Sequence, residues 1–230
     1  MQPPSHTPDY RTAAKTIDHS LLRPELTIEE VRDGCELAAK YDVASVCCRP
    51  ADVAFAADLL KGSDVAVGSV VGFPHGATLT STKVQETSAL VGLGATEIDM
   101  VINIGWLLSG RVAEVRDEIA EVVAAADGHI VKVILENAYL SNGQKVAGCE
   151  AVEAAGAHYV KTSTGFAPGG ATLEDVRLMR RSVSPHIKVK CAGGVRTLDA
   201  LFEMRAAGVD RSGATATEAM LDEYVSRYGR

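Results

Sequence analysis

The sequence is poor in aromatic residues and has no long apolar run. Phe, Trp and Tyr together make up 5% of the chain, with a single Trp, whereas hydrophobic residues reach 47% and glycine occurs 21 times. A transmembrane helix needs about 20 consecutive apolar residues, and no segment approaches that length. Abundant Ala and Val beside Gly allow helices to pack closely against strands. The composition therefore favours an α/β protein without membrane spans.

Cysteine spacing and charge exclude further classes of protein. The cysteines are odd in number and form no CxxC pair: Cys35, Cys47, Cys48, Cys149 and Cys191. We therefore expect neither a disulfide framework nor a redox motif. No His, Cys or Asp residues follow ligand spacing, so we expect no metal and no cofactor. A net charge of −7 argues against nucleic-acid or membrane partners, and the polar N-terminus lacks a signal peptide. Together these features favour a cytoplasmic location.

Short segments rich in Val and Ile alternate with helical segments along the chain. Eight candidate strands begin near Thr16, Val43, Val65, Thr96, Ile130, His158, His186 and Val209. Their spacing averages about 28 residues, enough for one strand, one helix and two short loops. This arithmetic predicts a single (β/α)₈ TIM barrel over residues 1–230, with a short polar N-terminal segment. An open doubly wound sheet is the alternative, but no glycine-rich fingerprint follows the first strand.

The segments between the strands carry helix signals. Thr27 and Glu30 form a capping box ahead of an apolar helical face. In residues 111–126, apolar residues recur at helical spacing, which predicts an amphipathic helix. We interpret the charges of that segment as a solvated face: Glu114, Arg116, Asp117 and Glu118.

Three ionisable residues lie in otherwise apolar strands, near the carboxyl ends where barrels place catalytic groups: Asp99, Lys161 and Lys190. Burial and a second ammonium group nearby both disfavour a charged lysine, so we expect the lysine pKa values to be lowered. A lysine that is partly free amine can attack a carbonyl group and form a Schiff base, and a carboxylate can relay protons. Lys132 and Lys188 lie further from the carboxyl ends of their strands. We expect them to be ion-paired or to lie in the bottom layer of the barrel, at the amino ends of the strands.

Small residues follow the last strands of the predicted barrel. Gly193 and Gly194 follow the seventh strand, Gly213 and Thr215 follow the eighth, and Gly165 lies on the same rim. Loops after strands seven and eight, beside a helix N-terminus, form the usual phosphate site of such barrels, because small residues let backbone N–H groups approach the anion. We therefore predict that these residues bind phosphate.

Six segments resemble the deoxyribose-phosphate aldolase family. They are IDHSLLRPELT (17–27), SVCCRP (45–50), VVGFPHGAT (70–78), EIDMVINIG (97–105), YVKTSTGFAPGGAT (159–172) and VKCAGGVRT (189–197). The resemblance implies a TIM-barrel lyase of deoxyribose phosphate catabolism. Such an enzyme reversibly cleaves 2-deoxyribose 5-phosphate into glyceraldehyde 3-phosphate and acetaldehyde. It also implies a homo-oligomer whose partners are small sugar phosphates and aldehydes.

The same resemblance implies a role for each candidate catalytic residue. Lys161 of the KTSTG string is the Schiff-base lysine. Lys190 perturbs its pKa and takes part in the proton relay. Asp99 is the proton donor and acceptor, and Asp18 is a supporting member of the relay.

The last phosphate loop and the C-terminal tail leave two questions. Thr215 and Ala216 stand where family members commonly have one or two serines, so we expect weaker phosphate affinity or a shifted contact. In some members a C-terminal tyrosine reaches the site, and Tyr224 and Tyr228 are the candidates here.

Alternatives to this function stay open from the sequence alone. One is another Schiff-base aldolase with a different sugar-phosphate substrate, and another is a non-catalytic barrel that binds a sugar phosphate. The role of the adjacent Cys47 and Cys48 is also open, since either thiol is a candidate for reaction with an aldehyde substrate.

Overall fold

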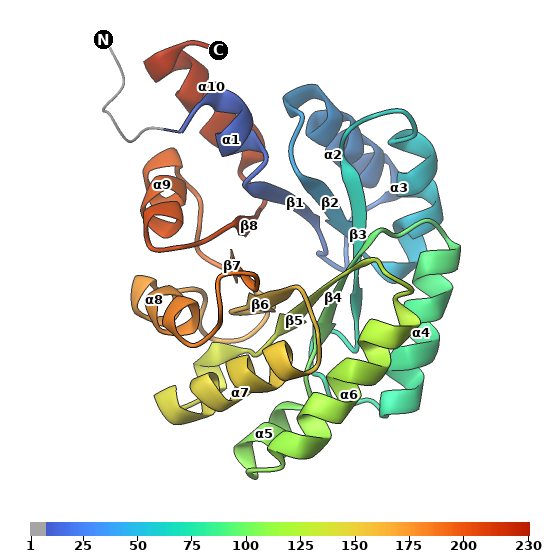
Figure 1. The fold of residues 1–230 in the computed structure, drawn as a ribbon. Coiled ribbons are helices and arrows are strands. Elements are labelled where there is room, and N and C mark those ends of the chain that lie inside the picture. Colours follow the sequence, from blue (N-terminus) through green and yellow to red (C-terminus); the bar gives the residue numbers. More distant parts are fainter. Residues whose placement is uncertain (1–7) are drawn as a thin grey trace.

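Eight parallel strands form a closed barrel in which each strand pairs with the next and β8 pairs with β1 (Figure 1). The computed structural model describes residues 8–230, so most of the expected polar N-terminal segment lies outside the described residues. The strands are β1 (Ile17–Leu21), β2 (Ser45–Cys48), β3 (Ala66–Val71), β4 (Glu97–Val101), β5 (Ile130–Ile134), β6 (Tyr159–Lys161), β7 (Lys188–Ala192) and β8 (Arg211–Ala214). Each begins within two residues of its predicted start. The predicted (β/α)₈ TIM barrel is confirmed.

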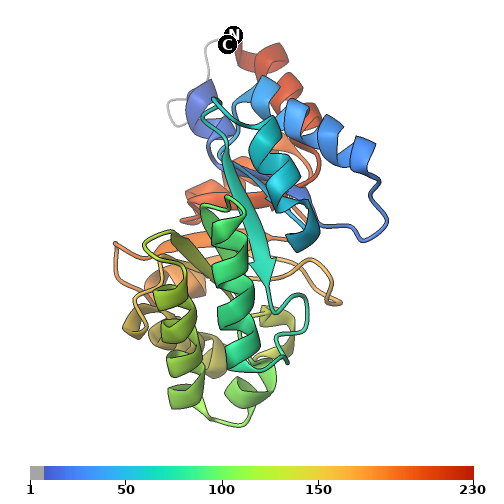
Figure 2. The same cartoon turned by 90° about the vertical axis from the view of Figure 1, so that its right-hand side faces the viewer.

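Helices surround the barrel, as two perpendicular views show (Figures 1 and 2). They are α1 (Tyr10–Ala14), α2 (Ile28–Tyr41), α3 (Val53–Leu59), α4 (Thr80–Gly92), α5 (Ile104–Leu108), α6 (Val112–Ala125), α7 (Asn142–Ala154), α8 (Leu173–Arg181), α9 (Leu198–Ala206) and α10 (Thr217–Tyr228), with short 3₁₀ turns η1 (Pro50–Asp52) and η2 (Asn137–Tyr139). The predicted capping box of Thr27 and Glu30 starts α2. Among the described residues, no helix has both the length and the apolar character to cross a membrane.

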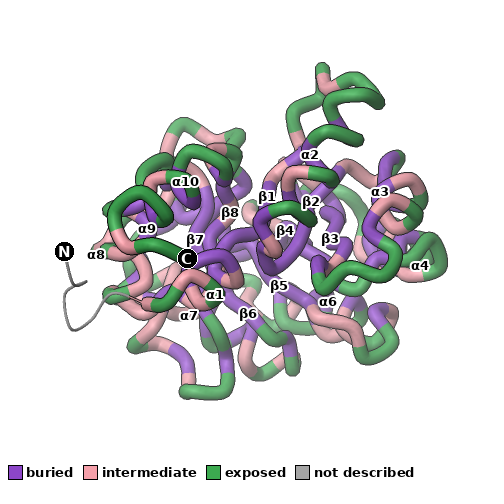
Figure 3. The backbone as a smooth tube through the Cα atoms, turned by 90° about the horizontal axis from the view of Figure 1, so that it is seen from above, coloured by how far each residue is buried: buried purple, intermediate pink, exposed green. Residues whose placement is uncertain are grey.

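The strands lie in the buried centre, and the helices expose only their outer faces (Figure 3). Successive strand residues point to opposite faces. In β4, Ile98 and Met100 belong to the aliphatic core and are fully buried. Glu97 and Asp99 alternate with them and reach charged residues of other strands inside the barrel. The alternation therefore directs the aliphatic side chains outward from the barrel and the charged side chains into its interior.

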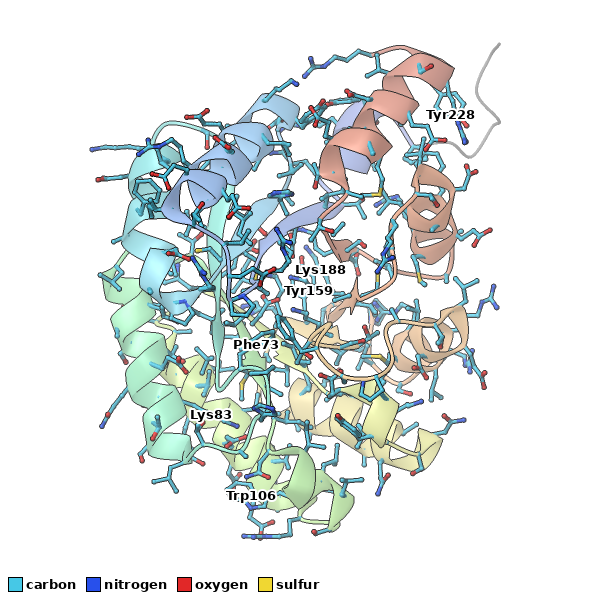
Figure 4. All side chains as sticks on the ribbon, turned by 180° about the vertical axis from the view of Figure 1, so that it is seen from behind. Phe73, Lys83, Trp106, Tyr159, Lys188 and Tyr228 are labelled. Carbon is cyan, nitrogen blue, oxygen red and sulfur yellow. The ribbon has the colours of Figure 1, made fainter. Side chains whose placement is uncertain are left out.

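Helix α6 differs from the sequence expectation at one residue. Glu118 is only 1% exposed, and its carboxylate lies 2.9 Å from the ammonium group of the equally buried Lys83 in α4 (Lys83 is labelled in Figure 4). The interpretation of Glu118 as part of a solvated face is wrong, whereas Arg116 and Asp117 are exposed as expected. Glu118 follows the buried Val115 by three residues, so the two share the inner face of the helix.

Candidate active site

A cavity of about 270 Å³ lies at the carboxyl end of the barrel, between the loops that follow the strands. Its lining includes three of the four predicted catalytic residues and all five predicted phosphate residues: Asp18, Lys161, Lys190, Gly165, Gly193, Gly194, Gly213 and Thr215. Asp99, the fourth catalytic candidate, does not line the cavity but contacts both cavity lysines. The residues chosen from the sequence therefore meet at one place.

Lys161 is the last residue of β6 and points into the barrel. Its side chain is 2% exposed, and its Nζ lies 2.7 Å from Asp99 Oδ2. Burial lowers the pKa of Lys161 below its ordinary value, the charge of Lys190 lowers it further, and Asp99 opposes both effects. The structure thus agrees with the lowered pKa expected for this lysine.

Lys190 of β7 has the opposite electrostatic balance. Its Nζ lies 2.7 Å from Asp99 Oδ2 and forms a close ion pair, at 2.5 Å, with Asp18 Oδ2. Burial favours the neutral amine, but Asp18 and Asp99 outweigh it and raise the pKa of Lys190. The expectation of a lowered pKa is therefore wrong for this residue, because two carboxylates hold its proton. The pKa values of both carboxylates are lowered, since the neighbouring cations outweigh the effect of burial.

Further charged residues continue this arrangement below the cavity. Lys132 of β5 lies 2.6 Å from Glu97 and 2.8 Å from Asp99. Arg211 of β8 lies 2.5 Å from Asp18 and 3.2 Å from Glu97. The ion pairing expected for Lys132 is present, but sequence reasoning did not place Glu97 or Arg211 in the site. A signal existed for Glu97, which precedes Asp99 by two residues and therefore shares its face of the strand.

The predicted phosphate residues form one rim of the cavity. Gly193 and Gly194 both have positive φ, at 79° and 102°, a conformation that favours glycine. Gly170, in the loop before α8, packs so closely on this turn that a Cβ atom there would lie 2.3 Å from the carbonyl oxygen of Gly193. Helix α10 begins just after Thr215, and Ala216 provides no side-chain cap for its free N–H groups. Such a rim is suited to an anion.

The sequence matches the model of an enzyme family over most of its length. The family described as DeoC/LacD family aldolase matches residues 8–216. The chain belongs to this family. It is therefore an aldolase, a carbon–carbon lyase, as the resemblance predicted.

Individual relatives of this aldolase cover nearly its whole length. The deoxyribose-phosphate aldolase of Caldanaerobacter subterraneus subsp. tengcongensis is 50% identical over 214 residues, 92% of this chain and 93% of that protein. That of Staphylococcus epidermidis (strain ATCC 12228) is 51% identical over 203 residues, 88% of this chain and 92% of that protein. The solved tetrameric deoxyribose phosphate aldolase of Aeropyrum pernix superposes with a TM-score of 0.89 at 29% identity, covering 96% of this chain and 94% of that one.

Two arginines that sequence reasoning did not single out also line the cavity of the aldolase. Arg23 lies in the loop after β1, and Arg196 follows the Gly193–Gly194 turn. Both side chains are on the exposed part of the rim. They add positive charge to a rim whose predicted phosphate contacts are backbone N–H groups and the hydroxyl of Thr215, although Arg23 also pairs with Glu25 at 3.3 Å. Arg196 could have been predicted as a phosphate-site residue, because it is a cation that closely follows the Gly193–Gly194 pair.

The two adjacent cysteines of the aldolase face different surroundings. Cys47 lines the cavity, and burial raises the pKa of its thiol to about 11. Cys48 does not line the cavity, and its Sγ lies 3.5 Å from the carbonyl oxygen of Gly68. Only Cys47 is therefore placed to meet a substrate, and its thiol is protonated at neutral pH.

Neither C-terminal tyrosine of the aldolase lines the cavity. The hydroxyl of Tyr224 donates to the carbonyl oxygen of Pro8 at 2.8 Å, and the ring of Tyr228 packs 5.3 Å from that of Tyr224. Figure 4 shows Tyr228 at the end of α10, away from Lys188 and Tyr159. Lys188 lies 5.6 Å over the ring of Tyr159. Its side chain is exposed and takes no part in the charged cluster.

Proposed function

We propose that this aldolase reversibly cleaves 2-deoxyribose 5-phosphate into glyceraldehyde 3-phosphate and acetaldehyde through a Schiff base on Lys161. The observation that carries the proposal is a buried lysine with a lowered pKa, 2.7 Å from a carboxylate, in a cavity with an anion-binding rim. The names of the relatives at about 50% identity support the choice of substrate.

Formation of the Schiff base uses Lys161 as nucleophile. The neutral amine attacks the C1 aldehyde of the open-chain sugar, and Lys190, which two carboxylates keep protonated, supplies a proton to the carbonyl oxygen. Asp99 accepts the proton that the attacking nitrogen releases, because its Oδ2 already contacts that nitrogen. Asp99 then returns this proton to the carbinolamine hydroxyl, which leaves as water. A protonated imine remains between Lys161 and C1, and Asp99 is again a carboxylate.

Carbon–carbon cleavage follows from the imine. The iminium group withdraws electrons from C2, so the bond between C2 and C3 breaks when the C3 hydroxyl loses its proton to Asp99, directly or through a water molecule. Glyceraldehyde 3-phosphate leaves, and the enamine of acetaldehyde remains on Lys161. Protonation at C2 and addition of water release acetaldehyde and restore the free amine. Asp18 supports the relay by holding Lys190 in place and charged.

The rim of the cavity binds the 5-phosphate. Gly165, Gly193, Gly194 and Gly213 let backbone N–H groups approach its oxygens, and Thr215 adds a hydroxyl group. The rim and Lys161 line the same cavity, so one phosphorylated open-chain sugar can occupy both. If the rim binds phosphate, the enzyme must prefer phosphorylated sugars to unphosphorylated ones.

Turnover of three sugars tests the proposed substrate. The rates with 2-deoxyribose 5-phosphate, ribose 5-phosphate and unphosphorylated 2-deoxyribose are compared by coupled detection of the aldehyde products. We expect the first sugar to have the highest kcat/KM. Equal values for the phosphorylated and unphosphorylated deoxy sugars would contradict the phosphate site, and a preference for ribose 5-phosphate would favour a different aldolase.

We further infer that the enzyme is a homo-oligomer that works in the cytoplasm. The tetrameric solved relative supports the first point, and five buried free cysteines support a reducing compartment. Light scattering coupled to size-exclusion chromatography is expected to give a multiple of 24.2 kDa, and a monomeric mass would contradict the inference.

A further inference from the structure

Seven charged side chains meet inside the barrel in one connected cluster. Four are cations and three are carboxylates when every group carries its usual charge: Lys132, Lys161, Lys190 and Arg211, and Asp18, Glu97 and Asp99. All are essentially buried except Arg211, whose side chain is 16% exposed. An excess buried charge is costly where water is excluded. The cluster therefore has one more cation than it can neutralise.

The cations share the carboxylates unequally. Lys132, Lys190 and Arg211 each contact at least two carboxylates. Among the carboxylates of residues 8–230, Lys161 forms an ion pair only with Asp99, and it shares the Oδ2 atom of that carboxylate with Lys190. The proton held least firmly is therefore the one on Lys161.

We propose that Lys132, Glu97 and Arg211 are positioning residues that set the protonation of the site: the seven-residue cluster is electrically neutral when one cation loses its charge, and Lys161, which has the fewest carboxylate contacts, is the cation that does so. They act through Asp99 and Asp18, without contact to the substrate cavity, which none of the three lines. The inference rests on the proposed function of Lys161 and extends it. The net charge of the whole barrel interior, and not Lys190 alone, determines whether Lys161 is a neutral amine.

Two further ionisable groups lie near Lys161 without belonging to the seven-residue cluster. Cys47 faces the cluster from β2, but burial raises the pKa of its thiol to about 11, so it is neutral. Glu136, after β5, directs its carboxyl group to the backbone N–H and hydroxyl of Thr164. Burial raises the pKa of Glu136, which favours its neutral form, and the charge of Lys161 opposes this effect. Within residues 8–230, Glu136 forms no ion pair with the cluster.

The directions of the pKa shifts agree with the count. Although burial lowers the pKa of all four cations, the carboxylates outweigh burial at Lys132, Lys190 and Arg211, whose pKa values are raised. Only at Lys161 does burial prevail, so its pKa is lowered.

Opposite charge changes at two neighbouring residues test the proposal. Lys132→Met removes a cation and Glu97→Gln removes a carboxylate, each with little change in side-chain size. The full-length protein is incubated with acetaldehyde and cyanoborohydride over a range of pH, and mass spectrometry follows ethylation of the Lys161 peptide. The midpoint of the labelling rate, measured relative to wild type, reports the ionisation of Lys161. Lys188→Met, on the same barrel but outside the cluster, is the matched control.

We expect the midpoint to move to higher pH in Lys132→Met and to lower pH in Glu97→Gln, each by roughly one pH unit for a single buried charge at an effective dielectric of about 20. The double variant restores neutrality with Lys161 as the amine, so its midpoint returns close to that of wild type. If Lys132→Met does not fold, Arg211→Gln removes a cation from the other side of the cluster and is expected to shift the midpoint upward.

The labelling experiment distinguishes failure of the proposed function from failure of the further inference. Absence of labelling at Lys161 in the wild-type protein would contradict the proposed function itself. Labelling of Lys161 with unmoved midpoints, or with both single variants shifted in the same direction, would leave the aldolase mechanism standing and overturn the proposal that the charge count prepares the nucleophile.

Discussion

Replacement of Lys190 by Met removes one cation from the immediate surroundings of Lys161 while keeping most of the apolar stem. The Nζ atoms of Lys161 and Lys190 each lie 2.7 Å from the same Asp99 oxygen, so they are no further apart than twice that distance. Two positive charges about 5 Å apart repel by roughly 3 kcal/mol at an effective dielectric of about 20. The Oδ2 atom of Asp99, which Lys161 and Lys190 share, is also left to Lys161, and this acts in the same direction.

The expected consequence is a raised pKa for Lys161 and less free amine at neutral pH. An energy of about 3 kcal/mol corresponds to roughly a 100-fold change in the protonation equilibrium. We therefore expect kcat/KM on the acid side of the pH profile to fall by about that factor in Lys190→Met, and the acid limb to move to higher pH. Loss of Lys190 as proton donor lowers the alkaline plateau separately.

A pH profile of kcat/KM separates these two effects. A lower plateau alone reports the lost proton donor, whereas a displaced acid limb reports the lost repulsion. Lys188→Met removes the lysine at the start of β7, two residues before Lys190. The Lys188 side chain is exposed and lies over the ring of Tyr159, so this variant should leave the pH profile unchanged. An acid limb in Lys190→Met that coincides with that of wild type would refute the electrostatic argument.

Three further predictions concern other parts of the barrel. His19 is buried beside Thr217, and burial lowers its pKa from 6.5 to about 4. The unfolded chain therefore binds more protons between these values, and stability is full above pH 6.5 and decreases as pH falls toward 4. His19→Gln should weaken this dependence in denaturant titrations at several pH values, and an undiminished slope would count against it. Lys83→Met leaves Glu118 buried without its cation and should cost about 3 kcal/mol of unfolding free energy. The double variant Lys83→Met/Glu118→Leu should recover most of that loss, and a double variant as unstable as the single one would show that the pair is not the cause. Arg196→Gln should raise KM for 2-deoxyribose 5-phosphate about tenfold, the usual effect of a lost charge-assisted hydrogen bond, and should spare unphosphorylated deoxyribose. Equal losses on both sugars would contradict a phosphate contact.

The positions of the strands could be predicted because the apolar segments recur at a regular spacing and each has a strong β composition. The candidate lysines could be found for a related reason. Lys161 and Lys190 are conspicuous in apolar strands, and a parallel barrel brings all carboxyl ends to one face. These local patterns were sufficient to bring the cavity residues together.

Pairing across the barrel could not be predicted, because the stagger between strands is not visible in the sequence. Lys132 and Arg211 contact carboxylates on neighbouring strands, and the register of each strand pair sets those distances. The raised pKa of Lys190 was missed for this reason: its two carboxylates come from β1 and β4. Glu118 was misplaced because the charges around it suggested solvent, whereas its partner Lys83 lies in a different helix.

Lys161 is the nucleophile of the proposed mechanism, and chemical trapping tests this role most directly. Acetaldehyde is added to the wild-type protein, the imine is reduced with borohydride, and the modified residue is located by mass spectrometry of peptides. We predict an ethyl group on Lys161, and its loss in Lys161→Met. A protein that cleaves the sugar phosphate with no adduct at Lys161, or with the adduct on another lysine, would contradict the account.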